Sequence, residues 1–265
     1  STPGPVTDDT PVSTLIIKPK QKIVMLGAPE EDITSLQQAA EVAPEIQDDL
    51  DIVEEIDPPL DQQPIIQERL QRRIASVEPK ILNPPRPGKK LLVLDIDYTI
   101  FDLGSAAERP EQLARPHLHE FMSTVYQHYD LAIWSATSMK WVEVKMKELG
   151  VTTHPDYKIT FMLDHKSMLT VNHPKYGVFD CKPLDFVWAK WEGYHKGNTI
   201  MFDDLKRNFV LNKGNGLVIV PYRKSHRNRE VDRELVYLKR YLMVIVERGE
   251  EDMSVLRHKH WRRYI

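Results

Sequence analysis

The stretch Lys89–Asp102, KKLLVLDIDYTIFD, decides the fold because an apolar strand runs directly into two carboxylates. Asp95 and Asp97 stand two residues apart, and Thr99 follows at the same spacing. Ligand sites of open parallel sheets lie beyond the carboxyl ends of the strands. The stretch therefore predicts a reactive pair at the end of a buried strand.

Further apolar runs follow along the chain, separated by helical patterns. They span residues 129–135, 157–163, 199–204 and 217–220. Near-continuous apolar strands that alternate with helices are typical of a parallel sheet with both faces covered. We therefore predict an α/β fold with a central parallel sheet, and residues 164–180 leave room for a small β-hairpin insert.

The helical patterns are amphipathic, with apolar residues at spacings of three and four. One is predicted before Pro79, one before Gly150 and one near the end of the sequence. Their apolar faces consist of Ile66, Leu70, Ile74 and Val77; of Met139, Val142, Met146 and Leu149; and of Val231, Leu235, Leu238, Leu242 and Ile245. We expect the last face to pack on the sheet.

A second acidic pair, Asp203 and Asp204, ends the apolar run at 199–204. If this strand neighbours the one before Asp95, four carboxylates converge at one edge of the sheet. Like charges at close range require a cation, since they otherwise raise one another's pKa. Ligands that are all oxygen favour a hard ion, so the pattern predicts Mg²⁺ with a phosphate as co-ligand.

Two further polar residues are candidates for binding that phosphate. Ser135 ends a third apolar run, where its hydroxyl can bind a phosphoryl oxygen, and Lys182 offers a positive charge. Each feature also has an ordinary structural interpretation. An acidic pair after a strand is commonly a turn or a helix cap, a serine there often caps a helix, and a lysine usually lies on the surface.

The net charge of −3 over 265 residues hides a strong segregation of charge. No Lys or Arg occurs between Ile23 and Glu68, and this acidic, proline-punctuated stretch is typical of a linker. Basic residues concentrate later, notably Lys206, Arg207, Arg223, Lys224, Arg227, Arg229 and Arg233. Such a basic face is either a solvated surface or a site for a phosphorylated or otherwise anionic partner.

The sequence has no apolar run of about 18 residues and no secretory pattern at its start, so we expect a soluble intracellular protein. The single cysteine, Cys181, excludes an internal disulfide framework. A cysteine-dependent phosphatase is also excluded, because Val187 stands where that chemistry needs an arginine. The first residue is Ser1 rather than Met, which is typical of a processed or partial chain.

The order of these motifs resembles the haloacid dehalogenase (HAD) superfamily, and within it the FCP/SCP-type phosphatases of the RNA polymerase II C-terminal domain. DIDYT at 95–99 matches the DxDxT motif of that group, and RPHLHEF at 115–121 resembles the helix that follows it. The likeness covers about residues 81–265. It implies a Rossmann-like three-layer sandwich and a phosphatase domain over residues 65–265.

The resemblance also implies a role for each site residue. Asp95 is expected to be the nucleophile, Asp97 the general acid and base, and Thr99 a residue that fixes the loop. Ser135 and Lys182 are expected to bind the phosphoryl oxygens. Mg²⁺ is expected to be held by the Asp95 carboxylate, the Asp97 main-chain carbonyl and the Asp203/Asp204 pair, with Asp204 as the direct ligand and Asp203 acting through water.

The expected activity is that of a nuclear protein-serine/threonine phosphatase acting on phosphoserine in the polymerase repeats. Residues 14–27 resemble the closing strand of a ubiquitin-like, β-grasp domain, which implies docking to the proteasome regulatory particle. About 75 residues are expected for such a domain, so residues 1–28 are either a remnant or a diverged form. Residues 29–64 are then the acidic linker, and no membrane or direct nucleic-acid contact is expected.

Two other functions stay open at this point. A phosphopeptide-binding adaptor without turnover is one, although carboxylates kept at the site would repel its ligand. A HAD phosphatase acting on nucleic-acid ends is the other, prompted by the basic residues, although no aromatic platform interleaves with them.

Overall fold

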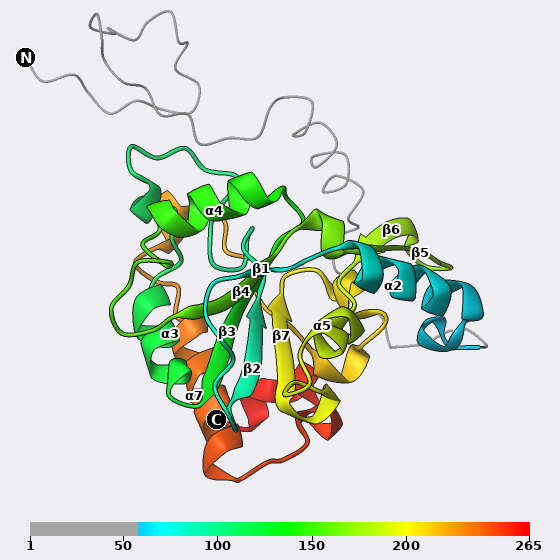
Figure 1. Cartoon of the computed structure of the whole chain (residues 1–265). Helices are drawn as coiled ribbons and strands as arrows, with labels where there is room; N and C mark the ends of the chain where they lie inside the picture. Colours follow the sequence, from blue (N-terminus) through cyan, green and yellow to red (C-terminus); the bar gives the residue numbers. More distant parts are fainter. Residues whose placement is uncertain (1–57) are drawn as a thin grey trace, which may run out of the picture. The chain divides into compact units, whose positions relative to one another are not determined.

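The computed structural model describes residues 58–265 (Figure 1). The predictions for residues 1–28, and for the linker as far as residue 57, lie outside the described residues. A short 3-10 helix, Leu60–Gln62, precedes the first described α-helix, α2. The α-helices are α2 (Pro64–Ser76), α3 (Leu118–Tyr126), α4 (Met139–Glu148), α5 (Leu184–Lys190), α6 (Ser225–Asn228) and α7 (Glu234–Glu247).

In the part of the chain that the structure describes, six strands form one sheet in the order β1-β4-β3-β2-β7-β8. These strands are β1 (Lys80–Ile81), β2 (Lys90–Leu94), β3 (Tyr129–Trp134), β4 (Ile159–Leu163), β7 (Thr199–Asp203) and β8 (Gly216–Val218). Five of them run parallel. The prediction of a parallel sheet is therefore confirmed, except that the two-residue edge strand β1 pairs with β4 in the antiparallel direction.

The strand order places a topological switch at β2. From β2 the chain passes through α3 to β3 and through α4 to β4, always toward the same edge of the sheet. It then returns to β7, which pairs with the opposite side of β2. Helices therefore cover both faces, and a crevice for ligands is expected at the carboxyl end of β2.

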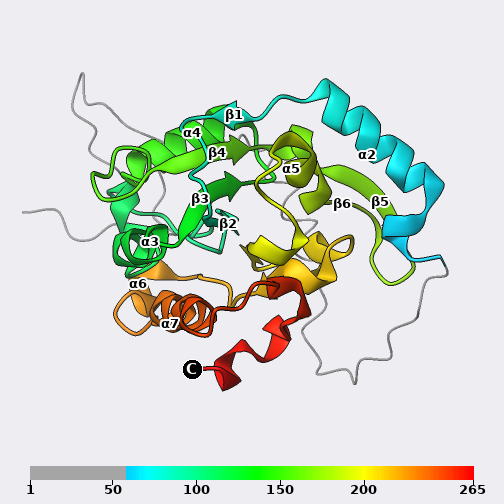
Figure 2. The ribbon, with the colours of Figure 1, turned by 60° about the horizontal axis from the view of Figure 1, so that its bottom comes forward.

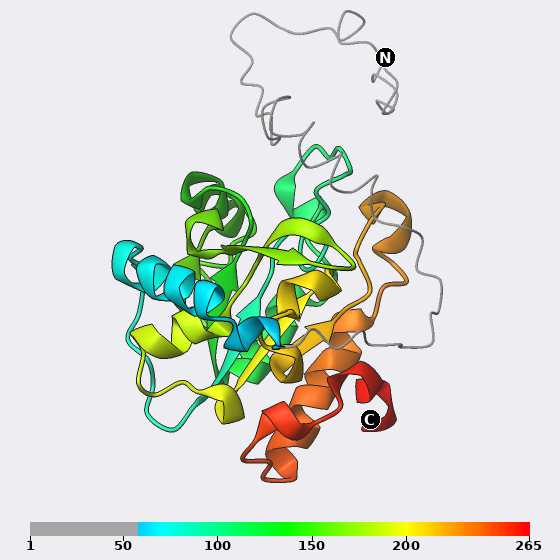
Figure 3. The same cartoon turned by 90° about the vertical axis from the view of Figure 1, so that its right-hand side faces the viewer.

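The two faces of the sheet carry separate apolar cores. Alternate residues of the strands, such as Leu92 and Leu94, pack with α3, α4 and α7. The intervening residues, such as Leu91 and Val93, pack with α2 and α5. Figure 2 shows α3 and α7 on one side of the strands and α2 and α5 on the other, and Figure 3 shows α2 and α7 apart in the same way. This is the predicted three-layer arrangement.

The expected hairpin insert is present as β5 (Leu169–His173) and β6 (Gly177–Cys181), an antiparallel pair outside the main sheet. Leu169, Val171 and Cys181 join the same core as α2 and α5. Directly after β6 comes Lys182, which is buried. The hairpin thus fixes the place of this lysine.

One detail of the predicted C-terminal helix is wrong. Leu235, Leu238, Leu242 and Ile245 are buried on α7 as expected, but Val231 is 71% exposed. The helix begins only at Glu234, since Arg233 has a non-helical conformation. Asp232, which pairs with the buried Arg115, accepts from the N–H of Glu234 at this end of the helix. Among the described residues, no helix is long and apolar enough to cross a membrane.

Candidate active site

The candidate site lies at the carboxyl ends of three neighbouring strands. Leu94 of β2 pairs with Ile133 of β3 and with Phe202 of β7, so the residues that follow come out side by side. The backbone N–H of Asp95 donates to the carbonyl of Phe202 at 3.0 Å. Register alone therefore brings Asp95, Ser135 and Asp203 to the same edge.

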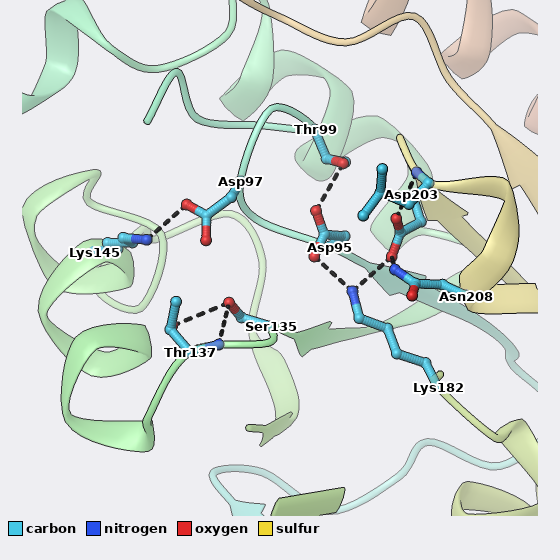
Figure 4. Close-up of polar contacts among 10 residues, drawn as sticks. Asp95, Asp97, Thr99, Ser135, Thr137, Lys145, Lys182, Asp203 and Asn208 are labelled. Carbon is cyan, nitrogen blue, oxygen red and sulfur yellow. Dashed lines mark hydrogen bonds and ion pairs between the residues drawn. The ribbon is translucent and has the colours of Figure 1, made fainter. Parts of the chain in front are cut away.

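Three of the predicted carboxylates gather there. Asp95, Asp203 and Asp204 each offer an oxygen, and these oxygens lie within 4.8 Å of one another. Lys182 bridges two of the three carboxylates, since its Nζ donates to Asp95 Oδ1 at 2.5 Å and to Asp203 Oδ2 at 2.6 Å (Figure 4). All of these side chains except that of Asp204 are buried. The sheet edge thus holds a largely buried acidic cluster around one ammonium group.

Burial and mutual repulsion of the carboxylates in this cluster favour the binding of protons or cations. Burial raises the pKa of Asp95 well above its usual range, against the opposing charge of Lys182. Burial and the neighbouring Asp203 raise the pKa of Asp204 to about 7, although Lys182 and Arg223 oppose them. Burial alone lowers the pKa of Lys182, but Asp203 and Asp95 outweigh it, so that this pKa lies above its ordinary value.

The loop after β2 fixes the orientation of Asp95. The hydroxyl of Thr99 donates to Asp95 Oδ2 at 2.9 Å, and Thr99 is buried. Tyr98 has a φ of 59°, a left-handed conformation that is rare for a residue with a side chain. Backbone bonds from Thr99, Ile100 and Phe101 to the carbonyl of Ile96 close the turn. Asp95 is thus held through both oxygens, by Lys182 and by Thr99.

Asp97 does not join the acidic cluster, so the expectation of four converging carboxylates is wrong. Its Oδ1 accepts a hydrogen bond of 2.6 Å from Nζ of Lys145 on α4 (Figure 4). The strand ends at Leu94, and the turn that follows breaks the alternation on which that expectation rested. The Asp97 side chain is also more exposed, at 18% against 8% for Asp95.

Ser135 is fully buried, and its hydroxyl lies 3.1 Å from Thr137 Oγ1. It also accepts from the backbone N–H of Thr137 at 3.3 Å. It does not cap α4, because that helix begins at Met139, whose N–H donates to Asp164 Oδ2. Asp164 carries out the capping for which Ser135 was an alternative candidate.

Two residues of the site were missed in the sequence. Asn208 donates from Nδ2 to Asp203 Oδ2 at 2.7 Å, and its carbonyl accepts from the N–H of Lys182 at 3.2 Å. No pattern in the sequence singles out this asparagine. Lys145 does have a signal, because it stands three residues after Val142 and four before Leu149, on the apolar stripe of α4.

The donor set fits a hard divalent cation. Three carboxylates and one ammonium leave two negative charges uncompensated when all four groups are ionised. Oxygens on opposite sides of Mg²⁺ lie about 4 Å apart, so the 4.8 Å spread needs only a small adjustment of the side chains. Asp203 already accepts from Lys182, Asn208 and the Leu205 N–H, whereas Asp204 is less buried and is the freer ligand.

Neither the cysteine nor the histidines of residues 58–265 form a second catalytic or metal-binding centre. Burial raises the pKa of the Cys181 thiol to about 12, so the reactive thiolate is disfavoured. Within residues 58–265, the only cluster able to hold a metal is the acidic one. Cys181 instead donates weakly to the carbonyl of Leu169 and belongs to the hairpin core.

Comparison with known proteins identifies the family of this chain. The family model of NLI interacting factor-like phosphatase matches residues 90–254. "Ubiquitin-like domain-containing CTD phosphatase 1" of Xenopus laevis is 49% identical over 262 residues, which is 98% of this chain and 81% of that protein. The Homo sapiens protein of the same name is 47% identical over the same shares.

Similar values hold for a plant protein. "Ubiquitin-like domain-containing CTD phosphatase" of Arabidopsis thaliana is 50% identical over 258 residues, which is 97% of this chain and 74% of that protein. A solved structure of Fcp1, described as an essential RNA polymerase II CTD phosphatase, gives a TM-score of 0.44 at 13% identity and covers 71% of each chain.

Taken together, the family match and the named relatives define a protein phosphatase of the HAD type. The chain belongs to the NLI interacting factor-like phosphatases, and its relatives at about half identity are the ubiquitin-like domain-containing CTD phosphatases. The resemblance to the FCP/SCP-type phosphatases is therefore confirmed.

Proposed function

We propose that this chain is a Mg²⁺-dependent protein-serine/threonine phosphatase that acts through a phosphoryl group carried on Asp95. The observation that carries the proposal is the double anchoring of Asp95, by Lys182 on one oxygen and Thr99 on the other, at the centre of the acidic cluster. A buried carboxylate in a fixed orientation suits in-line attack on phosphorus.

In the first step an oxygen of Asp95 attacks phosphorus, and the bond from phosphorus to the serine or threonine oxygen breaks. Asp97 gives a proton to that leaving oxygen. In the second step Asp97 takes a proton from water, the water oxygen attacks the same phosphorus, and phosphate leaves Asp95. The greater exposure of Asp97 suits a group that meets both the leaving oxygen and water.

The other site residues would hold charge and position. Ser135 and Lys182 would bind phosphoryl oxygens, and Asn208 would keep Asp203 and the Lys182 backbone in place. Asp95, the Asp97 carbonyl and Asp204 would hold Mg²⁺, with Asp203 acting through water. When bound, Mg²⁺ would shield the phosphate from the carboxylates and offset the charge on its oxygens.

A phosphoserine segment of a protein is the substrate that fits best. The only insert between β4 and β7 that has strands of its own is the small β5–β6 hairpin, which leaves the site open to a polypeptide. The relatives are named CTD phosphatases, which makes the repeats of the polymerase II C-terminal domain a specific candidate substrate. A protein that acts on this substrate would work in the nucleus. Docking to the proteasome regulatory particle was assigned to the ubiquitin-like segment, residues 1–28, which lies outside the described residues, and it stays a prediction.

The test is phosphate release from a phosphoserine heptad peptide with Mg²⁺ and with EDTA. Asp95→Asn should lose more than about 1000-fold in kcat, because it removes the nucleophile, and EDTA should abolish turnover of the native protein. Asp156→Asn, which changes an exposed carboxylate, is the matched control. Turnover without metal, or native activity in Asp95→Asn, would refute the mechanism.

A further inference from the structure

A cluster of positive charge is fixed beside the loop that follows β2 and carries Asp97 and Tyr98. Arg223, Lys224 and Arg227, here called the basic cluster, lie in and just before α6. The N–H of Tyr222 donates to the carbonyl of Tyr98 at 2.7 Å. The N–H of Ser225 donates to Asp102 Oδ2, also at 2.7 Å. Two backbone anchors, one on each side of Arg223 and Lys224, thus tie the segment to the loop that follows Asp97.

The guanidinium of Arg223 lies over the ring of Tyr98, with its carbon 3.8 Å from the ring centroid. Tyr98 stands between Asp97 and Thr99 in the loop that carries the proposed acid and base. An aromatic contact steadies a guanidinium without using its N–H groups on a carboxylate. Arg223 is therefore held at the margin of the site with donors to spare.

The basic cluster forms no salt bridge within residues 58–265, although the charge of Arg223 acts on Asp204 of the acidic cluster. All three side chains are exposed, and none takes part in an ion pair with a described residue. Two nearby arginines have their guanidinium groups engaged by other residues. Arg115 is paired with Asp232, and Arg229 donates to the backbone carbonyl of Glu111. The cluster therefore presents exposed cations that no carboxylate holds in a salt bridge, next to the acidic site.

From this geometry we infer that the basic cluster is a substrate subsite, which binds an acidic or phosphorylated side chain within about three residues of the scissile phosphoserine. The inference rests on the proposed function, since it gives the substrate of that same site its sequence preference. An extended peptide advances about 3.3 Å per residue, so such a side chain reaches from the phosphate to a group at the margin of the site.

A peptide fits the cluster better than a nucleic acid does. Binding of single strands without base pairing relies on aromatic rings that stack on bases. The ring of Tyr98 has a face covered by Arg223 and is only partly exposed. A guanidinium with free N–H groups beside two further cations is instead suited to a carboxylate or a second phosphate.

The experiment compares phosphoserine peptides that carry Glu at each position from −3 to +3 with a peptide that carries Gln throughout. The native protein should prefer at least one Glu peptide in kcat/KM. In Arg223→Gln the ratio of kcat/KM for the preferred Glu peptide to kcat/KM for the Gln peptide should fall by roughly 3- to 10-fold. In Arg223→Glu a peptide with Lys at the same position should become the preferred one. Arg240→Gln, an exposed arginine on α7, should keep the native ratio.

Binding to Asp95→Asn, measured by fluorescence anisotropy with the same peptides, gives a readout that does not need turnover. The same order of affinities is expected there, with a preference that weakens as salt rises. Equal ratios in the native protein and in Arg223→Gln would overturn the inference. It would also be overturned if Arg223→Gln weakened binding of a phosphorylated oligonucleotide and left binding of the acidic peptides unchanged. Failure of the proposed function would appear differently, as Asp95→Asn protein that still turns over.

Discussion

Two aspartates only two residues apart occupy different environments, and this difference separates their proposed roles. Asp95 is buried between Lys182 and Thr99, whereas Asp97 turns toward Lys145 and is partly exposed. The DxDxT spacing allows this because the strand ends at Leu94 and the next residues form a turn. A nucleophile needs one fixed orientation, and an acid and base needs access to the leaving group and to water.

Lys145→Ala should therefore lower kcat for a phosphoserine peptide by about 10-fold, since Asp97 loses the partner that orients it. The loss should be clearly smaller with p-nitrophenyl phosphate, because a nitrophenolate leaves without a proton from an acid. Steady-state kinetics with both substrates measure the two losses. Lys147→Ala, an exposed lysine on the same helix, is the control. Equal losses for both substrates would show that Lys145 does not act through Asp97.

Most of the site was predictable at the level of residues, and the exceptions have physical reasons. The apolar runs predicted strands that end at Asp95, Ser135 and Asp203, and the family resemblance added roles for Thr99 and Lys182. The neighbour relation of β2 and β7, which the sequence left as a condition, brings these residues together in the structure. The departure of Asp97 was not readable, since it depends on where a turn begins. Asn208 was missed because its partners, Asp203 and Lys182, meet it only after the chain has folded.

Among the elements, the C-terminal 3-10 helix, residues 258–263, is attached to α7 through a buried histidine. His258 Nδ1 lies 2.7 Å from the hydroxyl of Tyr241, and burial lowers the pKa of His258 to about 4 from 6.5. The unfolded chain binds this proton more tightly than the folded one. Stability from this group is therefore present above pH 6.5 and is lost as the pH falls toward 4.

His258→Phe should lose less stability than the native protein between pH 7 and pH 4, by up to roughly 3 kcal/mol, because the titrating group is gone. Urea unfolding at a series of pH values measures this difference. The carboxylates of the candidate site change stability with pH in the opposite direction. Because they are the same in both proteins, their contribution cancels in the comparison. His226→Gln, an exposed histidine, should keep the native pH dependence. Parallel curves for His258→Phe and the native protein would contradict the assignment.

On the scale of the molecule, the active site joins segments that are far apart in the sequence. Asp95 follows β2, Lys182 follows the hairpin, and Asp203 ends β7. The strand pattern predicted this assembly on the condition that β2 and β7 are neighbours, which the structure meets. The Arg115–Asp232 pair just before α7 joins residues far apart in the sequence, and no local pattern reveals it. Because unfolding separates the proposed metal ligands, binding of a cation to them must stabilise the whole fold.

The last prediction concerns metal and pH together. The pKa of Asp204 is raised to about 7, so without metal the ionised cluster destabilises the fold more and more as the pH rises from about 4 to 7. The proposed Mg²⁺ would bind the ionised carboxylates, so saturating Mg²⁺ should raise Tm by about 5 °C at pH 7.5 but hardly at pH 5. Calorimetry with Mg²⁺ and with EDTA measures the shift, which should vanish in Asp204→Asn and persist in Glu247→Gln, where the carboxylate is exposed. An equal shift at both pH values, or in Asp204→Asn, would place the cation elsewhere.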